Sequence, residues 1–270
     1  MSYPKIKLFS WRILEFIKFF FQAKSKWKIH SPFVYQLVTV VFPHQPTSFG
    51  NKVESIRKNY LRSTEEIQIE DFGAGFDNQK KRVICKKLGE ITKSSARKRK
   101  EGEFLYRIIK HHQPKFFLEL GTNLGFSTSY IAKALQEIYH DDYQLVSIEG
   151  SQNLHLKAKD LINNLQLKAE LIQDTFDNYL EKNFDIQWDG VFIDGNHNYE
   201  ATLRYFNFLK HHLKNGGFII FDDIYWSPEM QSAWKQIIQD ELITLSIDTF
   251  RWGLVYLNKN QAKEHFKILV

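Results

Sequence analysis

From residue 115 onwards, short apolar runs alternate with amphipathic stretches along the chain. The apolar runs have the length and composition of buried parallel strands. They lie at residues 116–120, 144–148, 169–173, 190–193 and 218–221. The stretches between them carry apolar residues at helical spacing, at 127–135, 154–165, 177–182, 199–213 and 228–240. Regular alternation of strand and helix predicts an α/β fold with a doubly wound, largely parallel sheet.

Two further β-rich runs, at 242–247 and 252–257, close this part of the chain. The spacer 248–251 is short enough for a hairpin, so the last strand is expected to be antiparallel. We therefore predict a Rossmann-like sheet of seven strands with an antiparallel C-terminal hairpin.

The first 112 residues follow a different, mainly helical pattern. Residues 8–21 have a broad apolar face beside a narrow polar stripe of Arg12, Glu15, Lys18 and Gln22. Ser31 followed by Pro32 predicts the start of a helix that reaches residue 41. Further helices are expected at 51–62 and 101–112. The chain should thus divide into a helical N-terminal extension or lid, residues 1–112, and a second domain, residues 113–270.

The apolar face of residues 8–21 has to be covered, because large exposed apolar patches usually mark interaction sites. We expect it to pack against its own domain or against a second copy in a homodimer formed through the N-terminal helices. A membrane surface is the alternative.

Composition places the chain among folded proteins, with 43% apolar and 25% charged residues. A lone cysteine, Cys85, rules out an internal disulfide framework and fits a reducing compartment. No run reaches the roughly 20 apolar residues of a membrane-spanning helix, and no cleavable signal is evident. We expect a cytoplasmic protein without a transmembrane segment.

The net charge of +6 is unevenly distributed. Residues 80–100 hold ten lysines and arginines against one acid, Glu90. Such a segment suggests nucleic-acid binding. We favour a solvated helix pair or a mobile lid, and nucleic acid as a partner is not expected. The glycine-punctuated stretch 71–75 has no partner that the sequence identifies.

The strand at 116–120 leads into a helix through a turn bracketed by Gly121 and Gly125. Glycines at the start of a helix let a ligand approach the backbone closely. The spacing is G-x-x-x-G rather than the G-x-G-x-x-G of dinucleotide enzymes.

Acidic residues stand at the carboxyl ends of all five predicted parallel strands, where open α/β sheets bind ligands. They are Glu119, Glu149, Asp174, Asp194 and the pair Asp222-Asp223. Glu149 is placed to accept two hydrogen bonds from a ribose diol, and Asp174 can meet an adenine edge. Three carboxylates at neighbouring strand ends repel one another unless a cation or protons intervene. Oxygen ligands suit Mg²⁺.

The motif Glu119 to Ser127, the acid Glu149 and the terminal hairpin resemble class I S-adenosylmethionine-dependent methyltransferases over residues 115–258. The resemblance implies that S-adenosylmethionine is the cofactor. It implies cofactor-binding roles for Glu119, Gly121, Ser127, Glu149 and Asp174.

Within that family the chain is most similar to a bacterial branch of the metal-dependent O-methyltransferases, of the catechol and caffeoyl-CoA type. The resemblance implies a small-molecule acceptor and a divalent metal held by Asp194, Asp222 and Asp223. It also implies that His197 is the catalytic base beside Asp194. Two positions depart from the family pattern, a histidine where catechol enzymes have a lysine and Asp223 where they have asparagine.

Three other functions stay open. The basic segment 80–100 could serve an RNA-directed methyltransferase, although no Asn/Asp-Pro-Pro-Tyr/Phe run follows the fourth strand. A nicotinamide-dependent oxidoreductase would need different glycine spacing and lacks the terminal hairpin. A catalytically silent binding module would not need acids at every strand end.

Overall fold

A computed structural model describes residues 5–71, 82–257 and 262–270. The chain forms two compact units. Residues 41–184 make up one of them, which we call the central unit. Residues 1–40 and 185–270 make up the other, which we call the terminal unit.

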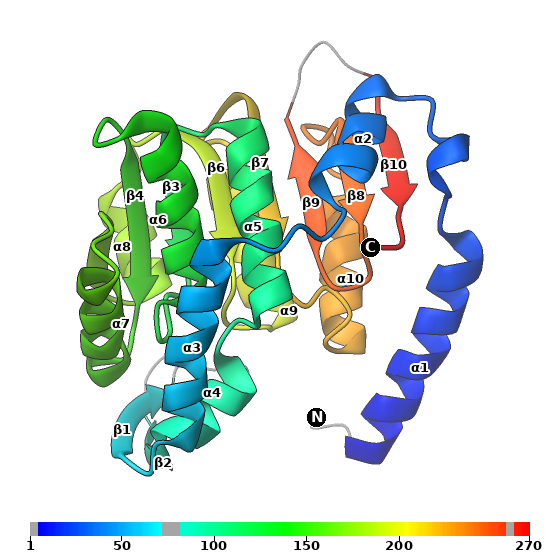
Figure 1. Cartoon of the computed structure of the whole chain (residues 1–270). Coiled ribbons are helices and arrows are strands. Elements are labelled where there is room, and N and C mark those ends of the chain that lie inside the picture. Colours follow the sequence, from blue (N-terminus) through cyan, green and yellow to red (C-terminus); the bar gives the residue numbers. More distant parts are fainter. Residues whose placement is uncertain (1–4, 72–81, 258–261) are drawn as a thin grey trace. The chain divides into compact units, whose positions relative to one another are not determined.

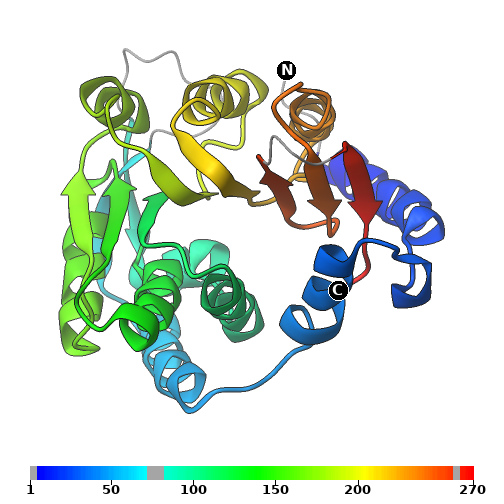
Figure 2. The same cartoon turned by 90° about the horizontal axis from the view of Figure 1, so that it is seen from above.

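Three parallel strands form the sheet of the central unit, in the order β3-β4-β5. They are β3 (Phe116–Leu120), β4 (Gln144–Glu149) and β5 (Glu170–Gln173). The helices that connect and follow them are α6 (Phe126–Tyr139), α7 (Gln152–Asn164) and α8 (Phe176–Lys182). Figure 2 shows α6 and α7 on one face of these strands and α8 on the other, which is the doubly wound arrangement.

The terminal unit holds five strands in the order β10-β8-β9-β7-β6. They are β6 (Trp188–Ile193), β7 (Leu213–Phe221), β8 (Leu245–Asp248), β9 (Gly253–Tyr256) and β10 (Glu264–Lys267). β6 and β7 are parallel, and β9 runs antiparallel to both β7 and β8, so the predicted hairpin is confirmed. Helices α9 (Tyr199–Leu209) and α10 (Pro228–Ile237) lie on one face of these strands (Figure 2).

The α/β, doubly wound, Rossmann-like fold predicted from the sequence is confirmed. The apolar runs of the parallel strands are buried, as at Phe117 and Leu118 in β3 and Ile219 and Ile220 in β7. The seven predicted strands are β3 to β9. The sequence analysis missed β10, which pairs parallel with β8. Its four residues are mostly polar and give no alternating apolar signal.

Helices dominate the first 112 residues, as expected. They are α1 (Lys5–Gln22), the 3-10 turn η1 (Lys26–Lys28), α2 (Pro32–Gln36) with the π-helical turn η2 (Leu37–Val41), α3 (Ser48–Arg62), α4 (Leu88–Ser95) and α5 (Arg99–His112) (Figure 1). Ser31 is the N-cap residue of α2 and Pro32 its first residue, as predicted, although the Ser31 side chain makes no capping hydrogen bond.

The basic segment is helical only in part, in α4 and the first residues of α5, which corrects the prediction of a helix pair for the whole segment. Its residues 82–87 form strand β2 (Arg82–Lys87), which pairs antiparallel with β1 (Glu66–Asp71). Ile67 and Ile69 of β1 alternate with polar residues and are buried, which is the pattern of a half-buried strand. Glu66 lies opposite Lys87, so cross-strand charge pairing offsets part of the positive charge. Residues 80 and 81 and the glycines at 73 and 75 lie outside the described residues.

Elements of the first 112 residues share a core with the strand–helix region. Val53 of α3, Ile67 of β1 and Ile91 of α4 pack in one buried cluster with Phe126 of α6 and Leu161 of α7. The division at residue 112 stays a prediction. Within the described residues, no helix is long and apolar enough to cross a membrane.

Candidate active site

The turn between β3 and α6 is fixed by backbone hydrogen bonds to β4. The N–H groups of Gly121 and Thr122 donate to the carbonyl of Ile148, at 3.0 and 3.1 Å. Gly125, the N-cap of α6, has a φ of 80°, and a Cβ there would lie 3.1 Å from Ala158 in α7. Glycine is therefore required at 125, both by the left-handed backbone and by the close approach of the two helices.

Glu149 lies beside this turn with both of its carboxylate oxygens engaged. Oε2 accepts the Asn123 N–H at 2.7 Å, and Oε1 accepts the Ser151 N–H at 2.9 Å. Burial raises the pKa of Glu149, and these backbone donors oppose that rise. The sequence analysis missed Asn123. Its φ of 50° is one that asparagine tolerates better than most residues, and this is the signal that could have marked it.

Glu119 is fully buried behind the turn. Its Oε2 accepts hydrogen bonds from the hydroxyl groups of Thr128 and Ser147. Burial raises the pKa of Glu119, while the hydroxyls of Ser127, Ser147 and Thr128 act to lower it. Ser127 is itself buried and faces this carboxyl group. The structure thus brings Glu119 and Ser127 together in the interior, and their cofactor-binding roles stay predictions.

Asp174 follows β5 and begins the turn into α8. Its Oδ1 accepts the Thr175 N–H at 2.8 Å and the Asn178 amide at 3.1 Å, and its Oδ2 accepts the Lys182 ammonium at 3.1 Å. Burial acts to raise the pKa of Asp174, but hydrogen bonds from Lys182, Asn178 and Thr175 outweigh it and lower the pKa. The predicted contact with adenine stays a prediction.

In the terminal unit, Asp194, His197 and Asp222 form a group that we call the Asp–His–Asp cluster. One ligand atom from each lies within 4.8 Å of the other two. Asp194 follows β6 and Asp222 follows β7. The register pairs Ile193 with Phe221, so the next residues of these parallel strands emerge side by side. The sequence predicted this meeting of Asp194 and Asp222 from their places at neighbouring strand ends.

His197 reaches the cluster because the chain turns sharply after β6. Asn196 has a φ of 50°, and Asn198 caps α9 by accepting the N–H groups of Glu200 and Ala201. The His197 ring lies with its centre 6.0 Å from that of Trp226. The capped helix start and the left-handed residue fix the short segment that carries the imidazole.

Asp222 is buried, with a relative exposure of 3%, and two donors from the β8–β9 turn reach it. The indole N–H of Trp252 donates to Oδ1, and the Arg251 guanidinium lies 3.5 Å from the same oxygen. Neither residue was predicted, because nothing local in the sequence links them to Asp222. Asp223 is not a member of the cluster. It has a φ of 50°, and its Oδ1 lies 3.8 Å from Arg251 Nε.

The side chains of the cluster are of types that bind divalent cations. Two carboxylates and an imidazole are common ligands, and metal–ligand bonds of roughly 2.1 Å place ligand atoms up to about 4 Å apart. An imidazole that binds the cation favours a transition metal such as Mn²⁺ over Mg²⁺, and one that stays outside its ligand shell is placed to act as a base. Asp223 lies outside this cluster, and its role as a ligand stays a prediction.

A comparison with known protein families matches the part of the chain that contains both the glycine turn and the Asp–His–Asp cluster. Residues 118–224 match the family model described as a methyltransferase domain. The match runs from β3 to just beyond the end of β7, and it includes the glycine turn and all three members of the Asp–His–Asp cluster.

Two curated proteins are similar to parts of the chain. An uncharacterized protein of Acanthamoeba polyphaga mimivirus is 38% identical over 55 residues, 19% of this chain and 25% of that protein. The glycine/sarcosine N-methyltransferase of Parasynechococcus marenigrum is 25% identical over 185 residues, 64% of this chain and 56% of that enzyme. The chain thus spans about a quarter and about half of the length of these relatives.

The fold is shared with solved methyltransferases. The O-methyltransferase TomG of Streptomyces achromogenes, crystallised with S-adenosylmethionine, superposes with a TM-score of 0.56 at 15% identity, over 83% of this chain and 95% of that one. The resemblance to class I methyltransferases noted in the sequence is confirmed at the level of the fold and of the domain.

Proposed function

We propose that the protein is an S-adenosylmethionine-dependent methyltransferase that acts on a hydroxyl oxygen of a small molecule. The observation that carries the proposal is the Asp–His–Asp cluster, which lies at the ends of β6 and β7 inside a methyltransferase domain. A nicotinamide oxidoreductase is disfavoured, because the matching family model is that of a methyltransferase.

The cofactor, when bound, supplies a methyl group activated on a sulfonium. Glu149 would bind the ribose diol, because each of its oxygens accepts one backbone N–H and keeps a lone pair. The backbone around Gly121 lets the cofactor approach, and the first turn of α6 has no side-chain cap. Asp174 would meet the adenine edge. Glu119 and Ser127 would support the turn from behind.

The acceptor hydroxyl must lose its proton, because neutral hydroxyls are poor nucleophiles. Asp194 and Asp222 would hold a divalent cation, which supplies a Lewis acid that favours the deprotonated oxygen. His197, within 4.8 Å of both carboxylates, would take the proton, and imidazole suits this task near neutral pH. Asp194 would orient both the cation and the base.

A second candidate is methyl transfer to an amine. It is favoured by the similarity to the glycine/sarcosine N-methyltransferase, which extends over 64% of this chain. An amine near neutral pH also needs a base, so His197 would serve either acceptor.

An assay of S-adenosylhomocysteine formation by mass spectrometry tests both candidates. The purified full chain is incubated with S-adenosylmethionine and separate pools of vicinal diols, hydroxy acids and amino acids, with Mn²⁺ or with excess EDTA. Turnover with a hydroxylated pool that stops in EDTA supports the proposal. Turnover confined to amino acids, indifferent to EDTA, supports the second candidate instead.

A further inference from the structure

Helix α1 has one side that is fixed to the rest of the terminal unit. Phe19, with a relative exposure of 1%, lies against the rings of Tyr225 and Phe250, with ring centres 6.3 and 5.5 Å away. Arg12 stacks over the Trp226 ring at 4.2 Å. The predicted packing of α1 against its own domain is confirmed for this side, and these contacts set which side faces outward.

The other side of α1 is apolar and exposed. Phe9, Ile13, Ile17 and Phe20 recur at intervals of three or four residues, so they share one face. Phe9 has a relative exposure of 66%, and Phe21, next to that face, has 81%. Figure 1 shows that α1 is a long, regular helix, so this face is continuous along it. A row of large exposed side chains on one helix marks an interaction surface.

Lysines outnumber acids in α1 and the segment after it, beside the uncharged polar residues Ser10, Gln22 and Ser25. Lys7 and Lys18 are exposed on α1, and the segment that follows it adds the exposed lysines Lys24, Lys26 and Lys28. The acid of this stretch, Glu15, is already paired with Lys18 at 2.6 Å and accepts a hydrogen bond from Gln231. Trp27, between the lysines, is also exposed. The face therefore combines exposed aromatic rings with a strong positive charge.

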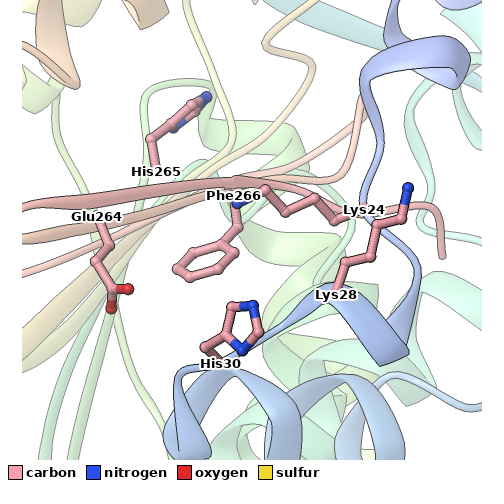
Figure 3. A pocket seen from close by; sticks show the side chains of 6 residues that line it. All are labelled: Lys24, Lys28, His30, Glu264, His265 and Phe266. Carbon is pink, nitrogen blue, oxygen red and sulfur yellow. The ribbon is translucent and has the colours of Figure 1, made fainter.

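A cavity of about 200 Å³ lies at the end of this segment (Figure 3). Its lining consists of Lys24, Lys28, His30, Glu264, His265 and Phe266. Burial lowers the pKa of His265 to about 4, so the positive charge of this lining comes from the two lysines, beside one acid. The Lys24 ammonium lies 4.9 Å from the centre of the Phe266 ring, so the lysine is held over an apolar floor. Two lysines beside an apolar ring leave a small excess of positive charge there, which attracts anionic headgroups.

We propose that α1 and the Lys24–Lys28 segment dock the protein on an anionic lipid surface. The helix would lie in the interfacial plane with Phe9, Ile13, Ile17, Phe20 and Phe21 among the acyl chains. The lysines would meet the phosphate groups. Aromatic and aliphatic residues on one face, with lysines beside them, are typical of interfacial helices.

Charge favours lipid over a second copy of the chain as the occupant. Two copies that pair through this face would place lysines near lysines in either orientation, because Lys7 is exposed at one end of α1 and Lys24, Lys26 and Lys28 at the other, and like charges at close range are destabilising. An anionic leaflet attracts the same lysines. The inference does not depend on the methyl-transfer reaction, so its failure and that of the proposed function are distinguishable.

Vesicle flotation of the full chain tests the proposal. We expect binding to vesicles of phosphatidylcholine with about 30% phosphatidylglycerol, and at least about ten-fold weaker binding to phosphatidylcholine alone or in 0.5 M NaCl. Phe21→Asp and Phe9→Asp should each reduce binding by about ten-fold or more, because a carboxylate replaces an inserted ring. Lys24→Ala combined with Lys28→Ala should weaken binding to anionic vesicles only.

Phe184→Asp is the matched control, since Phe184 is an exposed phenylalanine of the central unit with a relative exposure of 60%. This variant should bind vesicles like the wild type, and all variants should keep the wild-type melting temperature. Absence of vesicle binding, or binding that Phe9→Asp and Phe21→Asp leave intact, overturns the proposal. A concentration-dependent dimer in sedimentation velocity, split by Phe21→Asp without any vesicle binding, assigns the face to a second copy instead.

Discussion

The two groups of carboxylates at the strand ends of residues 118–224 have opposite surroundings. In the central unit, Glu119 and Glu149 are enclosed by hydroxyl and amide donors of the turn and of the adjoining β4 and α6 segments. In the terminal unit, Asp194 and Asp222 lie close to each other and to His197. The first arrangement holds a backbone in one shape, whereas the second concentrates ligand atoms around one point.

The two groups of carboxylates therefore have different expected roles, one in stabilising the turn and the other in the reaction. A carboxylate bonded to backbone N–H groups stabilises the conformation that a cofactor needs, and its loss should weaken binding or stability. Carboxylates gathered around an imidazole carry a cost of repulsion that only a cation, a proton or a fixed donor relieves. Loss of one of these carboxylates should lower turnover.

The largest effect is expected at the Asp–His–Asp cluster. Replacing the proposed base in His197→Ala should lower turnover by about 10²–10⁴-fold, the usual range for a positioned base. Asp222→Ala should lower it at least as much, because the Trp252 and Arg251 donors also lose their partner. Affinity for S-adenosylhomocysteine should stay nearly unchanged in both variants. Steady-state kinetics with the acceptor found in the screen measures these effects.

Titration with Mn²⁺ separates the roles within the cluster. Asp222→Ala should lose Mn²⁺ affinity, whereas His197→Ala should keep most of it if the imidazole acts as a base. Equal losses in the two variants would make His197 a ligand. Asp185→Ala, which removes an exposed acid of the same unit, is the control and should behave like the wild type. Normal turnover of Asp222→Ala, or full activity in EDTA, contradicts the metal-assisted account.

A moderate effect on stability is expected at the glycine turn. Gly125→Ala forces a left-handed backbone on alanine and crowds Ala158 at 3.1 Å, so we expect a loss of about 2–3 kcal/mol in the free energy of unfolding. Gly216 has a similar φ of 84° but open space around it. Gly216→Ala should therefore cost only about 1 kcal/mol, for the backbone alone. Urea denaturation compares the two, and equal losses would show that the α6–α7 contact is unimportant.

The smallest effect concerns the pH dependence of stability. Burial raises the pKa of Glu119 above that in the unfolded chain, so the folded state holds the proton more tightly. Its stabilising contribution is therefore present below the unfolded pKa and lost as pH rises through the folded pKa. Glu119→Gln, neutral at every pH, should gain stability relative to the wild type as pH rises from 4 to 8. Parallel melting curves of the two proteins across that range would contradict this.

The strands and the acids at their ends could be predicted from the sequence, because buried parallel strands have continuous apolar sequences. Asp194 and Asp222 could be placed together from that pattern alone. Trp252 and Arg251 could not, since they approach Asp222 only through the pairing of β9 with β7. Strand β2 was mistaken for helix because its basic residues belong to the run 80–100, and β1 was missed because the alternation of Ile67 and Ile69 is short. The contact of Asn123 with Glu149 could not be predicted either, because it depends on the left-handed backbone of Asn123 itself.

Calorimetric titration with S-adenosylhomocysteine tests the central claim most directly. The wild type should bind, and Glu149→Ala should lose roughly 1.5–3 kcal/mol of binding free energy, because the ribose hydroxyls and the Asn123 amide lose their acceptor. Glu170→Ala, which removes an exposed acid from the neighbouring strand β5, should bind like the wild type. Unchanged affinity in Glu149→Ala, or tight binding of NADH with none of S-adenosylhomocysteine, would contradict the assignment.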